Sequence, residues 1–188
     1  MTRGNLTYHF KDKSILLEAI TERFWAGIEI ERKKTRLLPS FENMHNEIQL
    51  FYSFQRKYAF IFLDHHVLNH PSIKKKFKTS AEDHIKEIEA TIAFAISAGN
   101  MKKEDYEGMY RSLAFSTWMI SFYWLNQQML LGGKTNKSSE EGEMKIWSML
   151  LPHLTDKGLK AFRKYFGDDY LKKLGSSLNT DIAEYVGF

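Results

Sequence analysis

The scarcity of proline, combined with helical spacing of apolar residues, limits what this chain can fold into. Three prolines stand in 188 residues, at positions 39, 71 and 152. Apolar residues recur at steps of three and four almost throughout, as between Ile73 and Ile96, and no segment alternates with a period of two. Because proline interrupts helices and strands follow a period of two, this pattern predicts an all-α fold.

The predicted helices are separated by these prolines, by polar capping residues and by glycines. They are a short helix over 2–10, a long one over 14–38, helical segments over 40–70 and 72–98, a long apolar helix over 103–130, and shorter helices over 140–151, 155–166 and 169–174. The stretch 131–139, which begins with two glycines after Leu131, is predicted to be a polar loop.

Composition excludes several classes of protein. The chain has no cysteine, which excludes a disulfide scaffold and thiolate chemistry and fits a reducing cytoplasm. Its longest apolar stretch, from Leu113 to Leu125, is shorter than the roughly 20 residues that span a membrane, so we expect no membrane partner. The formal charge of +4 is only a weak indication of a polyanionic partner.

The segment from Thr2 to Lys13 carries the side chains of a short DNA-reading helix. Leu6 and Phe10 lie four apart and point inward, which leaves small and polar side chains outside. An arginine can donate a bidentate pair to guanine and an asparagine can pair with adenine. Tyrosine, histidine and lysine suit phosphate oxygens, which fix the register of a protein on the duplex. Taken alone, the segment also fits an ordinary N-terminal helix.

This segment resembles the recognition helix of TetR-type transcription regulators, which often reads S/T-x-x-x-L-Y-x-H-F-K-N/D-K. Leu6 and the run from His9 to Lys13 match in register, whereas Thr7 stands where many members have tyrosine. The resemblance implies base contacts from the first residues and backbone contacts from the later ones. The predicted DNA-binding residues are Thr2, Arg3, Gly4, Asn5, Thr7, Tyr8, His9, Lys11 and Lys13.

The resemblance continues along the chain and predicts its domain organisation. The stretches Tyr58–Asp64 and Leu150–Thr155 are similar to the effector-domain and C-terminal helices of one TetR subgroup. In the family, a further helix and the first helix of the helix-turn-helix precede the position of Thr2, so the chain is expected to be N-terminally truncated. The predicted division is a helix-turn-helix remnant over 1–13, a connecting helix over 14–38, and an effector-binding and dimerisation domain over 39–188.

Aromatic side chains are dense in two stretches, Phe51 to Phe62 and Phe115 to Trp124. Large rings leave irregular gaps when they pack, and helical effector domains bind ligands in aromatic-lined cavities. We therefore predict a pocket for a small apolar or amphipathic effector, with a fully packed core as the alternative. The predicted lining residues are Tyr52, Phe54, Tyr58, Phe62, Tyr110, Phe115, Ser116, Trp118 and Tyr123.

Two predicted helices carry more apolar surface than one core covers. The helix over 103–130 is apolar nearly all round after Leu113, and the helix over 140–151 has a stripe of Met144, Trp147, Leu150 and Leu151. Paired across a two-fold axis, the two would form a four-helix bundle, as the resemblance implies. We therefore expect a homodimer.

These features predict a ligand-responsive, DNA-binding transcriptional regulator, a repressor that leaves operator DNA when its effector binds. The alternative is a helical ligand-binding or interaction module that does not bind DNA in this truncated form. A third reading is an enzyme with a metal held by Asp64, His66 and His70, because histidines four apart on a helix suit a metal. Two solvated histidines at a helix end explain the same spacing, and no catalytic constellation appears, so we expect no metal, no cofactor and no enzyme activity.

Overall fold

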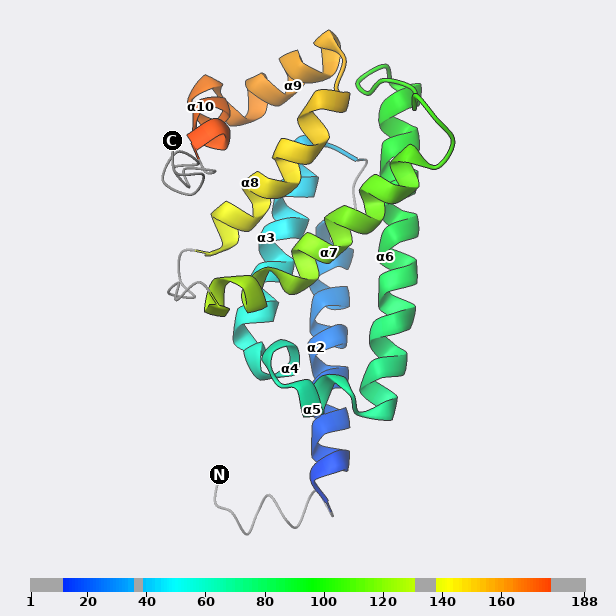
Figure 1. The fold of residues 1–188 in the computed structure, drawn as a ribbon, viewed down its shortest axis with the longest axis vertical. Coiled ribbons are helices and arrows are strands. Elements are labelled where there is room, and N and C mark those ends of the chain that lie inside the picture. Colours follow the sequence, from blue (N-terminus) through cyan, green and yellow to red (C-terminus); the bar gives the residue numbers. More distant parts are fainter. Residues whose placement is uncertain (1–11, 36–38, 131–137, 177–188) are drawn as a thin grey trace, which may run out of the picture.

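The computed structural model describes residues 12–35, 39–130 and 138–176, and these residues are helical apart from short connections (Figure 1). Within the described residues there is no strand, and the β-type pairing is an isolated bridge between Met101 and Leu154. The predicted all-α fold is therefore confirmed. None of the helices in this described part is both long enough and apolar enough to cross a membrane.

The helices follow the predicted segments closely, because their ends are set by proline and by capping side chains. Ser40 accepts a hydrogen bond from the Asn43 backbone N–H, and Pro71 stands in the first turn of its helix. The bounds are α2 Lys13–Thr35, α3 Phe41–Lys57, α4 Ala59–Leu63, α5 His65–Leu68, α6 Pro71–Ser97, α7 Met109–Leu130, α8 Ser138–Leu150, α9 Asp156–Phe166 and α10 Asp168–Ser176.

The predicted start of the long apolar helix at residue 103 is wrong, since α7 begins at Met109. Gly108 lies immediately before it with a φ of +82°, a conformation that a right-handed helix cannot include. The preceding turn is held instead by Tyr110, whose hydroxyl donates to the Lys102 carbonyl at 2.6 Å. The polar residues from 102 to 108 are therefore a connection between α6 and α7.

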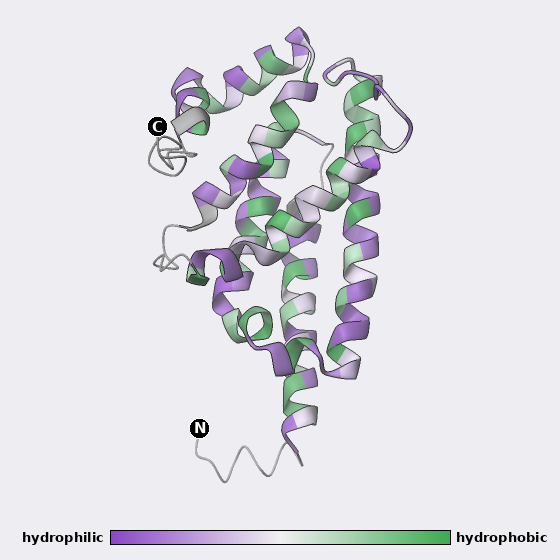
Figure 2. Cartoon of the chain, in the orientation of Figure 1, coloured by the Kyte–Doolittle hydropathy of each residue, from purple (hydrophilic) through white to green (hydrophobic). Residues whose placement is uncertain are grey.

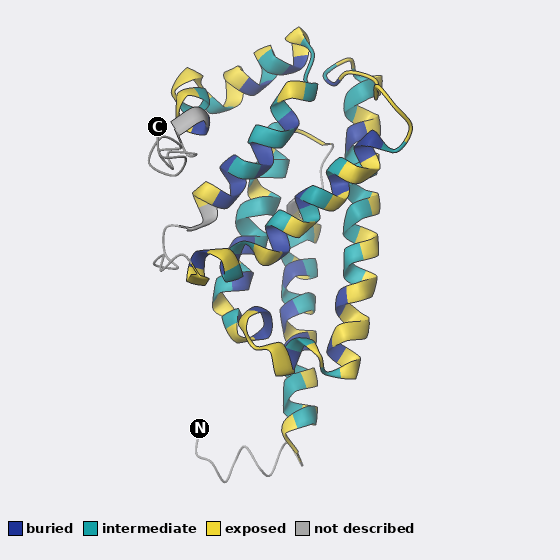
Figure 3. Cartoon of the chain, in the orientation of Figure 1, coloured by how far each residue is buried: buried dark blue, intermediate teal, exposed yellow. Residues whose placement is uncertain are grey.

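The helices pack around two apolar cores. Long α2 and α6 run along the molecule, α7 crosses them diagonally, and α9 and α10 lie beyond α8, at the opposite end from the start of α2 (Figure 1). One core joins α2, α4, α6 and α7 around Phe24, Phe62 and Phe122. The other joins α7, α8, α9 and α10 around Trp147 and Phe162. Helices α6, α9 and α10 are amphipathic, with exposed residues gathered along their outer faces (Figures 2 and 3).

The end of α6 is fastened to the start of α9 by backbone hydrogen bonds. The Lys102 N–H donates to the His153 carbonyl at 2.8 Å, and the Thr155 N–H donates to the Asn100 carbonyl at 3.0 Å. Gly158, in the first turn of α9, packs directly against this connection, and a Cβ placed on it would lie 2.0 Å from the Asn100 oxygen. Glycine is therefore required at this position for the two backbones to approach.

We expect Gly158→Ala to lower the free energy of unfolding by about 1–3 kcal/mol, because the new methyl group forces the α6–α9 connection apart. Alanine favours a helix by about 1 kcal/mol over glycine, so a net loss isolates the steric contact. Urea unfolding followed by circular dichroism measures the change. Lys160→Ala, at an exposed position of the same helix, is the control, with an effect within about 0.5 kcal/mol. A stabilised Gly158→Ala variant would contradict the contact.

Candidate functional site

A partly open cavity of about 600 Å³ lies among α2, α3, α6, α7 and α8. This volume is within the range of roughly 300–1,000 Å³ that is usual for sites binding drug-sized molecules. The lining residues are Trp25, Ile28, Glu29, Arg32, Met44, Glu47, Ile48, Leu50, Phe51, Phe77, Ser80, Asp83, His84, Lys86, Glu87, Ile88, Thr91, Ile92, Thr117, Trp118, Ser121, Phe122, Ile146 and Leu150.

One part of the cavity wall is aromatic. The ring centroids of Trp25 and Phe77 are 5.4 Å apart, those of Phe77 and Phe122 are 5.0 Å apart, and Trp118 stacks on Phe122 at 5.4 Å. These contacts follow the edge-to-face and offset geometries that aromatic quadrupoles favour. The rings are thus braced by one another and present a fixed apolar surface to the cavity.

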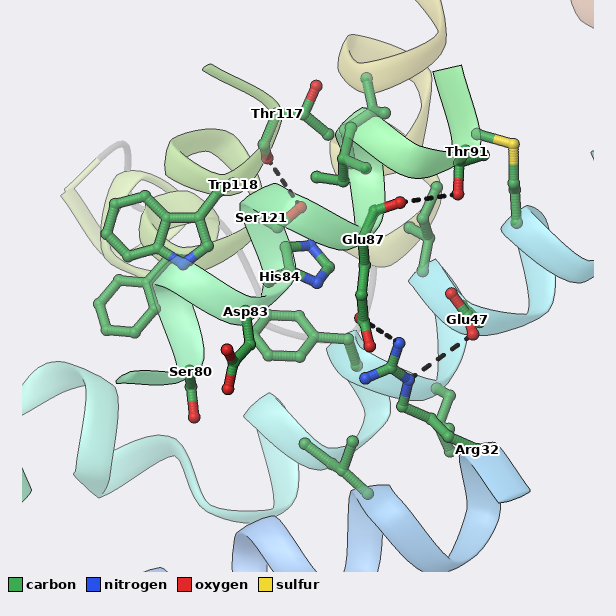
Figure 4. A pocket seen from close by; sticks show the side chains of 18 of the residues that line it. Arg32, Glu47, Ser80, Asp83, His84, Glu87, Thr91, Thr117, Trp118 and Ser121 are labelled. Carbon is green, nitrogen blue, oxygen red and sulfur yellow. Dashed lines mark hydrogen bonds and ion pairs between the residues drawn. The ribbon is translucent and has the colours of Figure 1, made fainter. Parts of the chain in front are cut away.

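The facing part of the wall carries an ion-pair network on Arg32. Its Nη2 lies 2.5 Å from Oε2 of Glu87, and its Nε lies 3.6 Å from Oε1 of Glu47, so one guanidinium joins α2, α6 and α3 (Figure 4). Burial by itself lowers the pKa of Arg32, but the hydrogen bond with Glu87 and the charge of Glu47 raise it overall. Arg32 therefore stays charged, and the carboxylates of Glu47 and Glu87 pair with it.

His84 lies between these two parts of the wall, with its ring among the lining side chains (Figure 4). Burial, reinforced by the positive charge of Arg32, lowers the pKa of His84 to about 4 against the opposing effect of Glu87. The imidazole is consequently neutral at physiological pH. A neutral imidazole has one N–H donor and one acceptor nitrogen, so His84 brings one of each to the cavity lining.

The comparisons with known proteins identify the family. A family model described as the TetR family of bacterial transcriptional repressors matches residues 28–162, which is more than half of the chain. The chain belongs to the TetR family. Its fold is similar to the crystal structure of a TetR-family transcriptional regulator from Marinobacter aquaeolei VT8, with a TM-score of 0.74, 16% sequence identity, and coverage of 94% of this chain and 83% of that one. No curated protein matches the chain. This protein is therefore a transcriptional regulator and not an enzyme.

In this TetR-family chain the cavity does not lie where the aromatic residues predict it. Of the nine predicted lining residues, all of which are described, Trp118 lines the cavity. Tyr58 and Phe62 are part of the core around Phe24, and Phe54 packs against that core. The predicted rings of α3 and α4 interlock, and the gap opens beside them.

The other predicted lining residues are scattered. Phe115 and Tyr123 are about half exposed on the outer face of α7, and the Ser116 hydroxyl donates to the Ser112 carbonyl of the same helix. Tyr110, in the first turn of α7, packs beside His153. Tyr52 is buried against Gly142, and burial raises the pKa of its hydroxyl against the opposing effect of Ser121.

The charged lining residues were missed by sequence reasoning, although a signal for them exists. Arg32 follows Phe24 and Ile28 in steps of four, so it continues the buried face of α2. His84 lies seven residues after Phe77 and four before Ile88, again on the buried face of its helix. A polar residue in register with an apolar stripe is the signal that would have found both.

The predicted DNA-binding residues from Thr2 to Lys11 lie outside the described residues. Lys13 is described, and it is exposed in the first turn of α2.

The histidines considered as metal ligands have other roles. The Asp64 carboxylate accepts from the His66 backbone N–H as a helix cap, and the His70 ring lies 2.5 Å from Ser14 Oγ and 2.9 Å from Ser72 Oγ. Within the described part of the chain, no three metal-binding side chains gather.

A second polar cluster lies outside the cavity, between α3 and α8. The buried carboxylate of Glu143 accepts hydrogen bonds from Gln49 Nε2 at 2.6 Å and Trp147 Nε1 at 2.7 Å, and its Oε1 lies 2.7 Å from His45 Nδ1. These partners satisfy a carboxylate that would otherwise be costly to bury. The cluster therefore fixes the packing of α8 on α3.

We expect the His84 imidazole to remain neutral at pH 6 and to take up its proton near pH 4, in an NMR titration assigned with His84→Gln. The unfolded chain binds this proton near pH 6.5, so the unfolding free energy falls as the pH drops from 6.5 to 4. His84→Gln removes this part of the pH dependence. A titration midpoint above pH 6 would show that the ring is solvated and does not belong to the cavity.

Proposed function

We propose that this protein is a cytoplasmic, ligand-responsive DNA-binding regulator, a repressor that releases its operator when a small amphipathic effector enters the cavity. The observation that carries the proposal is the position of the cavity against α2, which directly follows the segment with the predicted DNA-binding residues. An effector that binds one α2–α6 spacing better than another shifts the equilibrium between the two arrangements. Occupancy of the cavity would thereby change how the DNA-reading segments are presented.

This proposal keeps the predicted division of the chain. Residues 1–13 belong to the DNA-binding part, 14–38 connect it to the rest, and 39–188 bind the effector and a second copy. Most residues that line the cavity come from 39–188, which supports an effector site in that part of the chain. Helix α2 also contributes Trp25, Ile28, Glu29 and Arg32 to the lining. The connecting helix is accordingly part of the proposed effector site.

The proposed homodimer rests on α7. Phe115, Met119 and Tyr123 follow one another in steps of four on this helix and are 48%, 43% and 49% exposed. The stripe on α8 is not available for pairing, because Met144 and Trp147 are buried inside their own chain. A two-fold axis beside α7 would bring two identical apolar stripes together, and the self-complementary contact would cover them both.

We expect Met119→Glu to weaken the dimer at least tenfold, which is about 1.4 kcal/mol, because it places an unpaired carboxylate in the centre of the stripe. Sedimentation velocity at micromolar concentration measures the monomer fraction. Thr79→Glu adds the same charge at an exposed site on α6 and is the control. A wild-type protein that sediments as a monomer, or a Met119→Glu variant that remains dimeric, would contradict this interface.

The test of function is selection of duplex DNA by the protein expressed from its native gene, followed by release with small amphipathic molecules. We expect an inverted repeat whose half-sites lie about one helical turn apart. Arg3→Ala should relax base preference at a cost of about 1–3 kcal/mol, whereas Lys13→Ala should weaken all sites and flatten the salt dependence. Thr91→Phe, which fills the cavity, should keep DNA binding and lose release.

The outcomes separate the candidate functions. Failure to enrich any DNA sequence would favour a helical ligand-binding or interaction module over a DNA-binding regulator. Release of DNA from Thr91→Phe at the wild-type effector concentration would show that the effector binds elsewhere.

A further inference from the structure

The uncharged polar groups of the cavity favour one chemical class of guest. We infer that the effector is an uncharged molecule with an apolar, ring-containing body and a carbonyl oxygen, and that the cavity disfavours amines and carboxylates alike. This inference rests on the proposed function, since it takes the cavity as the effector site. It is carried by the pairing of the charged lining residues, by the hydrogen-bond donors of the lining and by the aromatic wall.

The ion pairs of the cavity wall oppose an acidic guest. Arg32 is held by Glu47 and Glu87, so a carboxylate guest would have to displace one of them to pair with the guanidinium. Lys86, which also lines the cavity, is exposed, and an ion pair in contact with water contributes little. A carboxylate that stays unpaired inside the cavity loses its hydration without compensation. The cavity therefore disfavours anions.

The His84 ring shows how the same cavity treats a positive charge. It lies between the Arg32 ion pairs and Trp118 (Figure 4). Burial and the positive charge of Arg32 lower the pKa of His84 to about 4, although the charge of Glu87 opposes the shift. A protonated amine beside this ring would meet the same loss of hydration and the same guanidinium. The cavity therefore disfavours cations as well, which leaves an uncharged guest.

The lining provides hydrogen-bond donors for an acceptor oxygen. The indole N–H of Trp25, on α2, is buried and has no hydrogen-bond partner among the described residues. The neutral imidazole of His84, on α6, contributes one N–H donor. The Trp118 indole and the Ser80 hydroxyl can donate as well. A carbonyl oxygen has two lone pairs, so it can accept from such donors without bringing a charge into the cavity.

The other uncharged polar groups of the lining do not require a donor on the guest. The hydroxyls of Thr91, Thr117 and Ser121 each donate to the carbonyl four residues earlier in their own helix, at 2.9 Å in each case. These hydroxyl donors are thus satisfied before a guest enters. The acceptor nitrogen of His84 can bind water, because the cavity is partly open. A carbonyl compound, which only accepts, therefore leaves none of these donors unpaired.

The aromatic wall suits the body of such a molecule. Trp118 and Phe122 stack with ring centroids 5.4 Å apart, and the rings of Phe77 and Trp25 extend the surface toward α2. A ring of the guest can pack against these faces and bury its apolar surface there. The same wall thus holds the apolar body and carries the indole donors for the oxygen.

A matched series of ligands tests the inference on the full chain. At pH 7, 4-phenylbutan-2-one is neutral, 4-phenylbutylamine is cationic and 4-phenylbutyrate is anionic, while all three share one apolar body. Isothermal titration calorimetry should give the ketone an affinity about tenfold above that of the amine or the carboxylate. Equal or tighter binding of either charged ligand would overturn the uncharged class and leave the effector cavity intact.

Two further outcomes separate this inference from the proposed function. Binding of none of the three ligands would overturn the inference. Ketone binding that is undiminished in Thr91→Phe, which fills the cavity, would contradict the cavity as the effector site and with it the proposed function.

A pair of His84 variants tests the hydrogen bond to the guest. His84→Leu removes the donor and the acceptor, whereas His84→Gln keeps one of each without a charge. The readout is the ratio of affinity for 4-phenylbutan-2-one to affinity for butylbenzene, which has the same carbon skeleton and no oxygen. His84→Leu should lower this ratio about fivefold, and His84→Gln should retain most of it. His66→Leu, at an exposed position outside the lining, is the control and should leave the ratio unchanged.

Trp25→Phe repeats the test from α2, because it removes the indole N–H and keeps an aromatic ring. It should also lower the ratio about fivefold, whereas Trp124→Phe, outside the lining, should not change it. The ratio is taken within each variant, so a general loss of stability cannot imitate the effect. A ratio that is unchanged in both His84→Leu and Trp25→Phe would overturn the inference.

Discussion

The ion pairs of Arg32 determine how three walls of the cavity stand relative to one another. A guanidinium on α2 is held by Glu47 on α3 and Glu87 on α6. Such partly buried pairs contribute little net stability, because desolvation offsets most of the attraction, but removing one partner is costly. Their effect is on specificity, since they permit one register of α2 against its neighbours. The space beside them stays open because charged side chains cannot collapse into it as aliphatic ones would.

The aromatic residues show why a packed core and a cavity can lie side by side. Phe24 contacts Tyr58 and Phe62 edge to face, with ring centroids 5.5 Å and 5.4 Å apart, and these rings leave no room for a guest. The cavity begins beyond Trp118, where hydroxyls, His84 and the ion pairs replace rings along the same helices. The dense aromatic stretches of the sequence therefore mark mainly the packed core, and of the residues they predicted for the pocket Trp118 lines the cavity.

The sequence was sufficient for the fold class and for most helix ends, because Ser40, Pro71 and similar residues act locally. The sequence was insufficient to predict the burial of a residue wherever that burial depends on which other helix covers its face. Phe115 and Tyr123 have the composition of core residues, yet no helix of the described chain covers them. Arg32 stands in a basic run that is typical of solvated surfaces, and only its register with Phe24 indicates burial. Periodicity defines the faces of a helix, whereas tertiary packing decides what each face meets.

Helix α6 joins two distant parts of the structure, because one of its ends is fastened to α9 and the other lies close to the start of α2. At its C-terminal end, Lys157 Nζ donates to the Ala98 carbonyl and the Thr155 hydroxyl donates to the Gly99 carbonyl, both at 2.7 Å. The helix has 27 residues and so a length of about 40 Å, with His84 and Glu87 near its middle. The middle of this helix is part of the cavity wall, and its N-terminal end stands away from the α9 contact. That end adjoins His70, which contacts Ser14 at the start of α2.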